Sequence, residues 1–156
     1  MPLFMTLFLV LGLMLGSGKT AHAQQQVDPH DRQMLTFYFH TTTLQDQALD
    51  KYAHAELQKA EQAGRPVEPR VAMLPGMVVI SLESVTICDR KRGCPLLVFR
   101  DITQKPTLKD FSYQNISITQ RPKGTFLYLR DEDGNKECFI PPGGGKANCV
   151  RPKKKP

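Results

Sequence analysis

Apolar and polar positions along residues 77–102 (MVVISLESVTICDRKRGCPLLVFRDI) follow the pattern of two β-strands joined by a short loop. The loop, residues 89–93, is too polar to be buried, and it carries the adjacent cations Arg90, Lys91 and Arg92. The second strand contains the continuous apolar run 96–99, which is typical of a strand in the interior of a sheet. We therefore expect a β-hairpin with a charged tip.

The buried face of the first strand changes parity part-way along. Apolar residues occupy positions 78, 80 and 82, and then positions 85 and 87. One extra residue in a strand restores the inward-facing set, so this pattern predicts a β-bulge near Glu83 and Ser84.

Three further short strands are predicted over residues 115–120, 125–130 and 136–140. The segments between them are rich in proline, glycine, aspartate and asparagine, which tight turns favour. Strands joined by local turns pair antiparallel. We therefore expect a meander of about five short strands, curled or barrel-like.

The first of two predicted N-terminal helices covers residues 28–39. Asp28 and Pro29 are residue types that begin helices, and apolar side chains recur at helical spacing at Met34, Leu35, Tyr38 and Phe39. A strand is the alternative, because positions 35, 37 and 39 also alternate. The capping residues favour the helix.

The second predicted helix covers residues 44–63, which contain no proline, glycine or β-branched residue. Thr42 or Thr43 would cap it, with Gln45 or Asp46 three residues later, close to a capping box. Gly64 would end it. The prolines at positions 66, 69 and 75 then predict an extended connector to the hairpin.

The N-terminus resembles an export signal. Residues 3–15 are apolar except for one threonine, and Ala21-His22-Ala23 matches the A-x-A pattern of signal peptidase sites. We expect residues 1–23 to be a cleaved signal peptide and the protein to be periplasmic or secreted. An uncleaved anchor is the alternative, although a span needs about 20 apolar residues. Residues 24–150 would form a single α+β domain, and residues 151–156 a disordered basic tail.

The net charge of +6 is unevenly distributed along the chain. Residues 24–150 hold 16 basic and 15 acidic residues, whereas the tail adds four cations, Arg151, Lys153, Lys154 and Lys155. A nucleic-acid binder would carry its cations on a structured face with aromatic residues among them. The sequence lacks that pattern, so nucleic acid is not an expected partner.

The four cysteines are the strongest chemical signal. An even number of cysteines in an exported chain indicates disulfides. We expect the local pairs Cys88–Cys94 and Cys138–Cys149, because each closes one loop at hairpin distance. A zinc site would favour C-x2–4-C spacing, and a redox site C-x-x-C, neither of which is present.

Other candidate chemistry is weak. The histidines at positions 30, 40 and 54 are interpreted as surface residues, although His54 follows Asp50 by four residues and could share a helix face with it. Residues 131–135 lack the ligand spacing of a calcium loop, and residues 143–146 lack that of a phosphate loop. Asn115 begins a glycosylation sequon, which matters only in a eukaryote. We expect no cofactor, no metal and no enzymatic activity.

The predicted fold is therefore α+β, with two N-terminal helices packed on one antiparallel sheet and two local disulfides. The predicted function is that of an exported, non-enzymatic protein acting by protein–protein contact, such as an accessory subunit of a cell-envelope assembly. One alternative is a secreted inhibitor that presents Arg90, Lys91 and Arg92 to an enzyme. The other is attachment to an anionic polymer or membrane surface through the basic tail.

Overall fold

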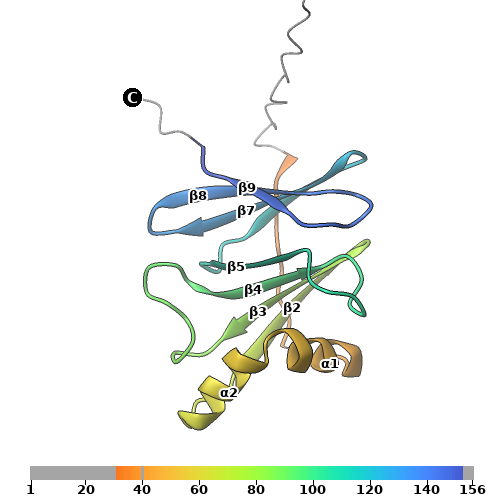
Figure 1. Ribbon diagram of the computed structural model, residues 1–156. Coiled ribbons are helices and arrows are strands. Elements are labelled where there is room, and N and C mark those ends of the chain that lie inside the picture. The colour runs from red at the N-terminus through yellow and green to blue at the C-terminus, as the bar shows by residue number, and fades with distance from the viewer. Residues whose placement is uncertain (1–30, 40, 153–156) are drawn as a thin grey trace, which may run out of the picture.

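Two antiparallel β-sheets and two helices form three layers in the computed structural model, which describes residues 31–39 and 41–152 (Figure 1). The five-stranded sheet has the strand order β1-β6-β7-β8-β9, and the four-stranded sheet has the order β2-β3-β4-β5. The four-stranded sheet lies between the five-stranded sheet and the helices (Figure 1). The predicted α+β content and the two disulfides are confirmed. The predicted single sheet of about five strands is wrong.

The elements follow one another in the order β1 (Gln33–Met34), α1 (Thr43–Tyr52), α2 (His54–Gln62), β2 (Glu68–Leu74), β3 (Met77–Glu83), β4 (Cys94–Phe99), β5 (Leu108–Ser112), β6 (Ser117–Arg121), β7 (Gly124–Asp131), β8 (Gly134–Ile140) and β9 (Asn148–Val150). The helices follow β1, so they are not N-terminal to every strand as predicted.

The four-stranded sheet is buried on both faces. Alternate residues of β3 and β4 face the five-stranded sheet, among them Met77, Val79, Leu96 and Val98. The intervening residues face the helices, among them Ile80, Leu82, Leu97 and Phe99. A strand with two buried faces has a continuous apolar sequence. This explains the run at residues 96–99, which does form an interior strand between β3 and β5.

The expected bulge at Glu83 and Ser84 does not form. β3 ends at Glu83, and residues 84–87 make a turn in which the amide of Ile87 donates to the carbonyl oxygen of Ser84. Val85 is 80% exposed, whereas Ile87 packs into the helix-side core. The parity change therefore marks the end of a strand. The predicted connector is also corrected, because β2 occupies most of it and pairs with β3.

Residues 31–39 are extended, and the predicted helix over residues 28–39 is wrong there; Asp28 and Pro29 lie outside the described residues. β1 pairs with β6, and Tyr38 exchanges two backbone hydrogen bonds with Val71 of β2. The segment, orange in Figure 1, thus runs past both sheets along one side. Leu35 and Phe37 pack against the core between the sheets.

The predicted helix over residues 44–63 forms as two helices that meet at Ala53. Thr42 and Gln45 form the expected capping box at its start. At the break, the carbonyl oxygen of Tyr52 accepts a hydrogen bond from Lys109 Nζ (3.0 Å). Ala53 itself is fully buried against the four-stranded sheet. Tertiary contacts therefore accompany a break for which the sequence has no proline or glycine.

The C-terminal half agrees with prediction more closely. β6, β7 and β8 form the expected antiparallel meander, and residues 131–134 make a hairpin turn. Disulfides join Cys88 to Cys94 and Cys138 to Cys149, as expected. Cys138 and Cys149 lie opposite each other on β8 and β9. The second disulfide therefore fixes the short edge strand β9 to the five-stranded sheet.

Candidate functional site

The backbone of the disulfide-closed loop, residues 88–94, is hydrogen-bonded both internally and to Tyr113. Asp89 Oδ1 accepts from the amides of Lys91 (2.8 Å) and Arg92 (3.0 Å). Tyr113 donates its hydroxyl to the carbonyl oxygens of Arg90 and Lys91. Gly93 has a φ of 91°, and a Cβ there would lie 2.1 Å from the carbonyl oxygen of Ser112. Only glycine fits this turn.

Two of the three loop cations already have acidic partners. Lys91 Nζ lies 3.5 Å from Glu132 Oε1, and Arg92 lies 3.6 Å from Asp89 Oδ2. Arg92 also covers the ring of Phe111. The amide hydrogen bonds from Lys91 and Arg92 lower the pKa of Asp89, so its carboxylate stays charged. Arg90 is the one loop cation without an ion pair among the described residues.

Arg151, predicted as the first cation of the binding tail, is bound within the domain. Its Nη1 donates to Asp131 Oδ1 (2.8 Å), and its Nη2 contacts Asp131 Oδ2. Asp131 is only 6% exposed, and the hydrogen bond from Arg151 lowers the pKa of its carboxyl group. Lys153, Lys154 and Lys155 lie outside the described residues. We call residues 88–94, residues 131–134 and Arg151 together the disulfide end.

The opposite end of the sandwich carries cations without such partners. This end, the glycine-loop end, comprises residues 100–107, 121–125 and 140–147. Backbone contacts join its loops, since the amide of Ala147 donates to the carbonyl oxygen of Thr107 (2.9 Å). In the part of the chain that the structure describes, four of its cations form no ion pair: Arg100, Lys105, Lys123 and Lys146.

Arg100 connects the two sheets at this end. Its Nη2 donates to Thr125 Oγ1 (3.1 Å) and to the carbonyl oxygen of Ile140 (3.2 Å). Its Nε is buried and has no hydrogen-bond partner among the described residues. Burial lowers the pKa of the guanidinium, with no carboxylate to oppose that effect. Arg100 is therefore a half-buried cation held by neutral acceptors.

A groove of about 200 Å³, lined by both apolar and polar groups, runs between β2 and the segment that precedes the helices. Its lining includes Met34, Tyr38 and Met73, which are 61%, 60% and 68% exposed. Phe39, 62% exposed, follows Tyr38 and lies under the guanidinium of Arg70. Large apolar side chains exposed together commonly mark contact sites for other proteins.

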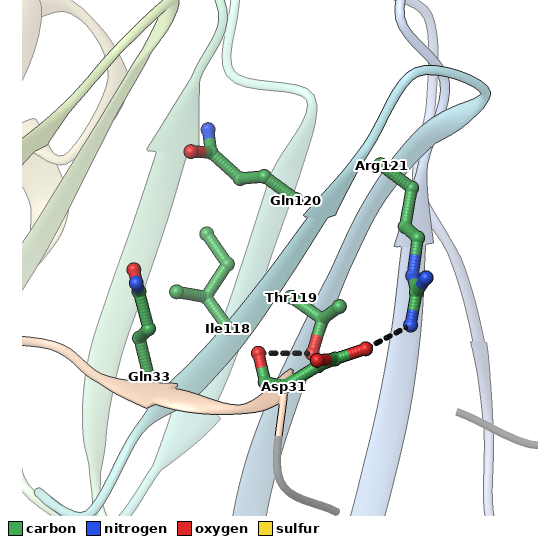
Figure 2. A pocket seen from close by; sticks show the side chains of 6 residues that line it. All are labelled: Asp31, Gln33, Ile118, Thr119, Gln120 and Arg121. Carbon is green, nitrogen blue, oxygen red and sulfur yellow. Dashed lines mark hydrogen bonds and ion pairs between the residues drawn. The ribbon is translucent and has the colours of Figure 1, made fainter. Parts of the chain in front are cut away.

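A polar pocket of about 360 Å³ continues this groove (Figure 2). The two hollows share Gln33 and Ile118 in their lining. Figure 2 shows the aspartate and arginine of the pocket paired, with Arg121 Nη2 2.6 Å from Asp31 Oδ2. Gln120 Nε2 donates to the carbonyl oxygen of Pro75 (3.2 Å) and so connects β6 to the β2–β3 turn. The lining is thus mixed in the groove and predominantly polar in this pocket.

The remaining candidates carry little chemistry. His54 Nδ1 lies 3.2 Å from Asp50 Oδ1 on exposed helix surface, so these residues do share a face. His30 and His40 lie outside the described residues. One set of potential metal ligands is close together, Asp110 with Cys138 and Cys149, but both sulfurs are already joined in a disulfide. Asn115 is exposed on the loop before β6.

The groove residues were not predicted from the sequence. The strand alternative for residues 35–39 contained the signal, because Leu35 and Phe37 pointing inward would leave Met34 and Tyr38 outside. The helix prediction put Met34 and Tyr38 on the buried face with Leu35. Met73 fell in a segment predicted as a connector.

No family model, curated protein or solved structure matches the chain. Among the described residues, no helix is long and apolar enough to span a bilayer. Function must therefore be inferred from the chain's own surfaces.

Proposed function

We propose that the chain is an exported, non-enzymatic protein that acts by binding another protein through the groove beside β2, as an accessory subunit of a cell-envelope assembly would. One observation carries the proposal: Met34, Tyr38 and Met73 are each at least 60% exposed and line one groove. Exposing such side chains together gains nothing for the fold, whereas a partner would remove them from water at about 25 cal/mol per Å².

Export is supported by the A-x-A pattern at residues 21–23 and by the two disulfides, which form readily outside the reducing cytosol. The described surface offers no convergent set of nucleophile, base and oxyanion donors in either hollow. A binding role needs only the exposed groove.

The test compares a triple variant of the groove with a single substitution of the same kind elsewhere on the surface. In the first, Met34, Tyr38 and Met73 are all replaced by serine; in the control, Val85→Ser removes an apolar side chain that is 80% exposed elsewhere. Both should fold with the wild-type melting temperature. Cross-linking in the source cells, followed by mass spectrometry, should yield an envelope protein with wild type and control but not with the groove variant. A partner retained by the groove variant would refute the proposal.

The inhibitor hypothesis is a second candidate, favoured by the rigidity of residues 88–94. A loop that is already ordered loses little conformational entropy on entering an enzyme cleft. Arg90 is its cation without an ion pair among the described residues, so Arg90→Glu should abolish inhibition at an unchanged melting temperature. Attachment through Lys153, Lys154 and Lys155 stays a prediction: binding to anionic vesicles should fall steeply with salt and vanish on truncation after Pro152, which keeps the Arg151–Asp131 pair.

A further inference from the structure

β6 has an edge that β1 covers only in part. Leu35 donates to the carbonyl oxygen of Ile116, and Gln33 pairs with Ile118. The next outward pair along this ladder would join Gln120 to Asp31. Asp31 instead accepts from the hydroxyl of Thr119 through its carbonyl oxygen (3.4 Å) and binds Arg121 through its carboxylate. The ladder therefore ends before Gln120.

The main-chain N–H and C=O of Gln120 face this edge, where no described residue pairs with them. Arg121 and Gly124 close a two-residue hairpin loop, so the odd-numbered residues of β6 direct their main-chain groups to β7. The even-numbered residues direct theirs outward, as the bond from Leu35 to Ile116 shows. In Figure 2, Asp31 lies with Thr119 and Arg121, away from the side on which Gln120 and Gln33 lie. The polar pocket is the space that remains beside Gln120.

This edge is continuous with the groove beside β2, since both hollows are lined by Gln33 and Ile118. Past the polar pocket lies the turn with Lys123, which forms no ion pair within the described ranges. The one carboxylate that lines the two hollows, Asp31, is already paired with Arg121. Among the described residues, the net charge at this end is therefore positive.

We propose that the groove binds an extended segment of the partner protein, which adds to β6 by main-chain hydrogen bonds at Gln120. Apolar side chains of that segment lie against Met34, Tyr38 and Met73, and acidic side chains follow toward Lys123. This is recognition by strand addition, in which main-chain bonds give affinity and side-chain pockets give specificity. The inference rests on the proposed protein-binding function and specifies the partner's chemistry.

A matched pair of substitutions tests the main-chain bond. Gln120→Ala removes the side-chain bond to Pro75 but keeps the main-chain N–H; Gln120→Pro removes both. Proline is tolerated in an edge strand where the N–H points to solvent, so both variants should fold, as melting curves would verify. The probe is a phage-displayed library of random linear peptides, panned on the full chain expressed with its own leader and with both disulfides oxidised.

Enriched peptides should contain alternating apolar residues followed by aspartate or glutamate. By fluorescence polarisation, a synthetic peptide from this set should bind Gln120→Pro about tenfold more weakly than Gln120→Ala. Met73→Ser should weaken binding about tenfold, and Lys123→Glu about threefold at low salt. Arg90→Glu, at the disulfide end, should leave it unchanged.

Equal binding to Gln120→Pro and Gln120→Ala would overturn strand addition while leaving the apolar contact intact. Enrichment of basic peptides, or of none, would overturn the assigned chemistry. A wild-type dimer that Met73→Ser dissociates in sedimentation would assign the groove to a second copy. Peptide binding seen only after deletion of residues 24–30 would assign it to the chain's own N-terminal segment. Loss of the natural partner from the groove variant alone would still support the proposed function.

Discussion

The two ends of the sandwich carry cations in comparable density but neutralise them differently. At the disulfide end, Lys91, Arg92 and Arg151 each contact a carboxylate. At the glycine-loop end, Arg100, Lys105 and Lys146 contact none among the described residues. A cluster of cations in the sequence is therefore a poor guide to where uncompensated charge lies on the surface.

The difference follows from the turn that each end contains. The acidic turn at residues 131–134 lies against the loop at residues 88–94, because the amide of Glu132 donates to the carbonyl oxygen of Lys91 (2.8 Å). At the other end, the corresponding turn between β6 and β7 contains Pro122 and Lys123. Most cations of the disulfide end are thus paired with nearby carboxylates, whereas Arg100, Lys105, Lys123 and Lys146 form no ion pair among the described residues.

The largest effect is expected from the disulfides. Replacing Cys138 and Cys149 by alanine should lower the free energy of unfolding by about 2.8 kcal/mol, and replacing Cys88 and Cys94 by about 2.4 kcal/mol, from loop-closure entropy. Cys138 is also fully buried in the core between the sheets, so its replacement should increase the difference in stability between the two variants. Urea unfolding at pH 7 measures both. A greater loss of unfolding free energy for the Cys88 and Cys94 variant would show that this disulfide stabilises the fold by more than loop-closure entropy.

The next effect concerns the ion pair between exposed Arg151 and buried Asp131 at the disulfide end. Asp131→Asn should lower the free energy of unfolding by about 2 kcal/mol at pH 7, because the buried side chain loses its charge-assisted hydrogen bonds with Arg151. Asp133→Asn is the control: its side chain is 74% exposed and lies 3.8 Å from Arg151, so it should change stability by less than about 0.5 kcal/mol.

The contribution of this ion pair to the free energy of unfolding should decrease as the pH falls. The pKa of Asp131 is lowered in the folded state by the hydrogen bond from Arg151. Its contribution is therefore complete above the unfolded-state pKa of about 4 and is lost as the pH falls through the folded-state value. Wild type and Asp131→Asn should converge in stability below about pH 4. A constant difference down to pH 2 would contradict the assignment.

Features encoded within a few residues were predictable from the sequence. The capping box of Thr42 and Gln45 is fixed by residue types three positions apart. The turns at residues 121–124 and 131–134, and both disulfides, likewise join residues close in sequence. Each of these signals depends on local geometry alone, and each is present in the structure.

The second sheet was not predictable by the same means. An alternating pattern reports one buried face, but Val79 and Ile80 are both fully buried, on opposite faces of β3. The helices cover one face and the five-stranded sheet the other, so alternation disappears. The helix prediction for residues 31–39 was wrong for a related reason. Their apolar spacing fits a helix or a strand, and the backbone partners at Ile116 and Val71 decide between them.

The candidate site was the least predictable feature. Its groove is formed by β1, β2 and β6, which are distant in sequence, and two of these strands were assigned to other structures. The ion pairs of the disulfide end could not be predicted from the sequence either, because Glu132 reaches Lys91, and Asp131 reaches Arg151, only in the folded chain. Sequence patterns locate charges, whereas tertiary structure decides which charges are compensated.

The two smallest expected effects come from one substitution at each end, Lys136→Met and Arg100→Met, and together they test the comparison between the ends most directly. Lys136, beside the disulfide end, is 14% exposed and lies 2.8 Å from Asp110 Oδ2, whose side chain is 26% exposed. Lys136→Met would leave that carboxylate half-buried without its nearest cation, and we expect a loss of about 1.5 kcal/mol.

Arg100→Met is the matched change at the glycine-loop end. It removes a half-buried cation that has no carboxylate partner in the described chain, so two hydrogen bonds to neutral acceptors are lost while the desolvation cost of the charge is relieved. These terms oppose each other, and the net change should stay within about 1 kcal/mol. Urea unfolding of both variants at pH 7 compares them directly. A greater loss for Arg100→Met than for Lys136→Met would mean that Arg100 is primarily a structural bridge between the sheets, and that the charge at the glycine-loop end is already committed to the fold.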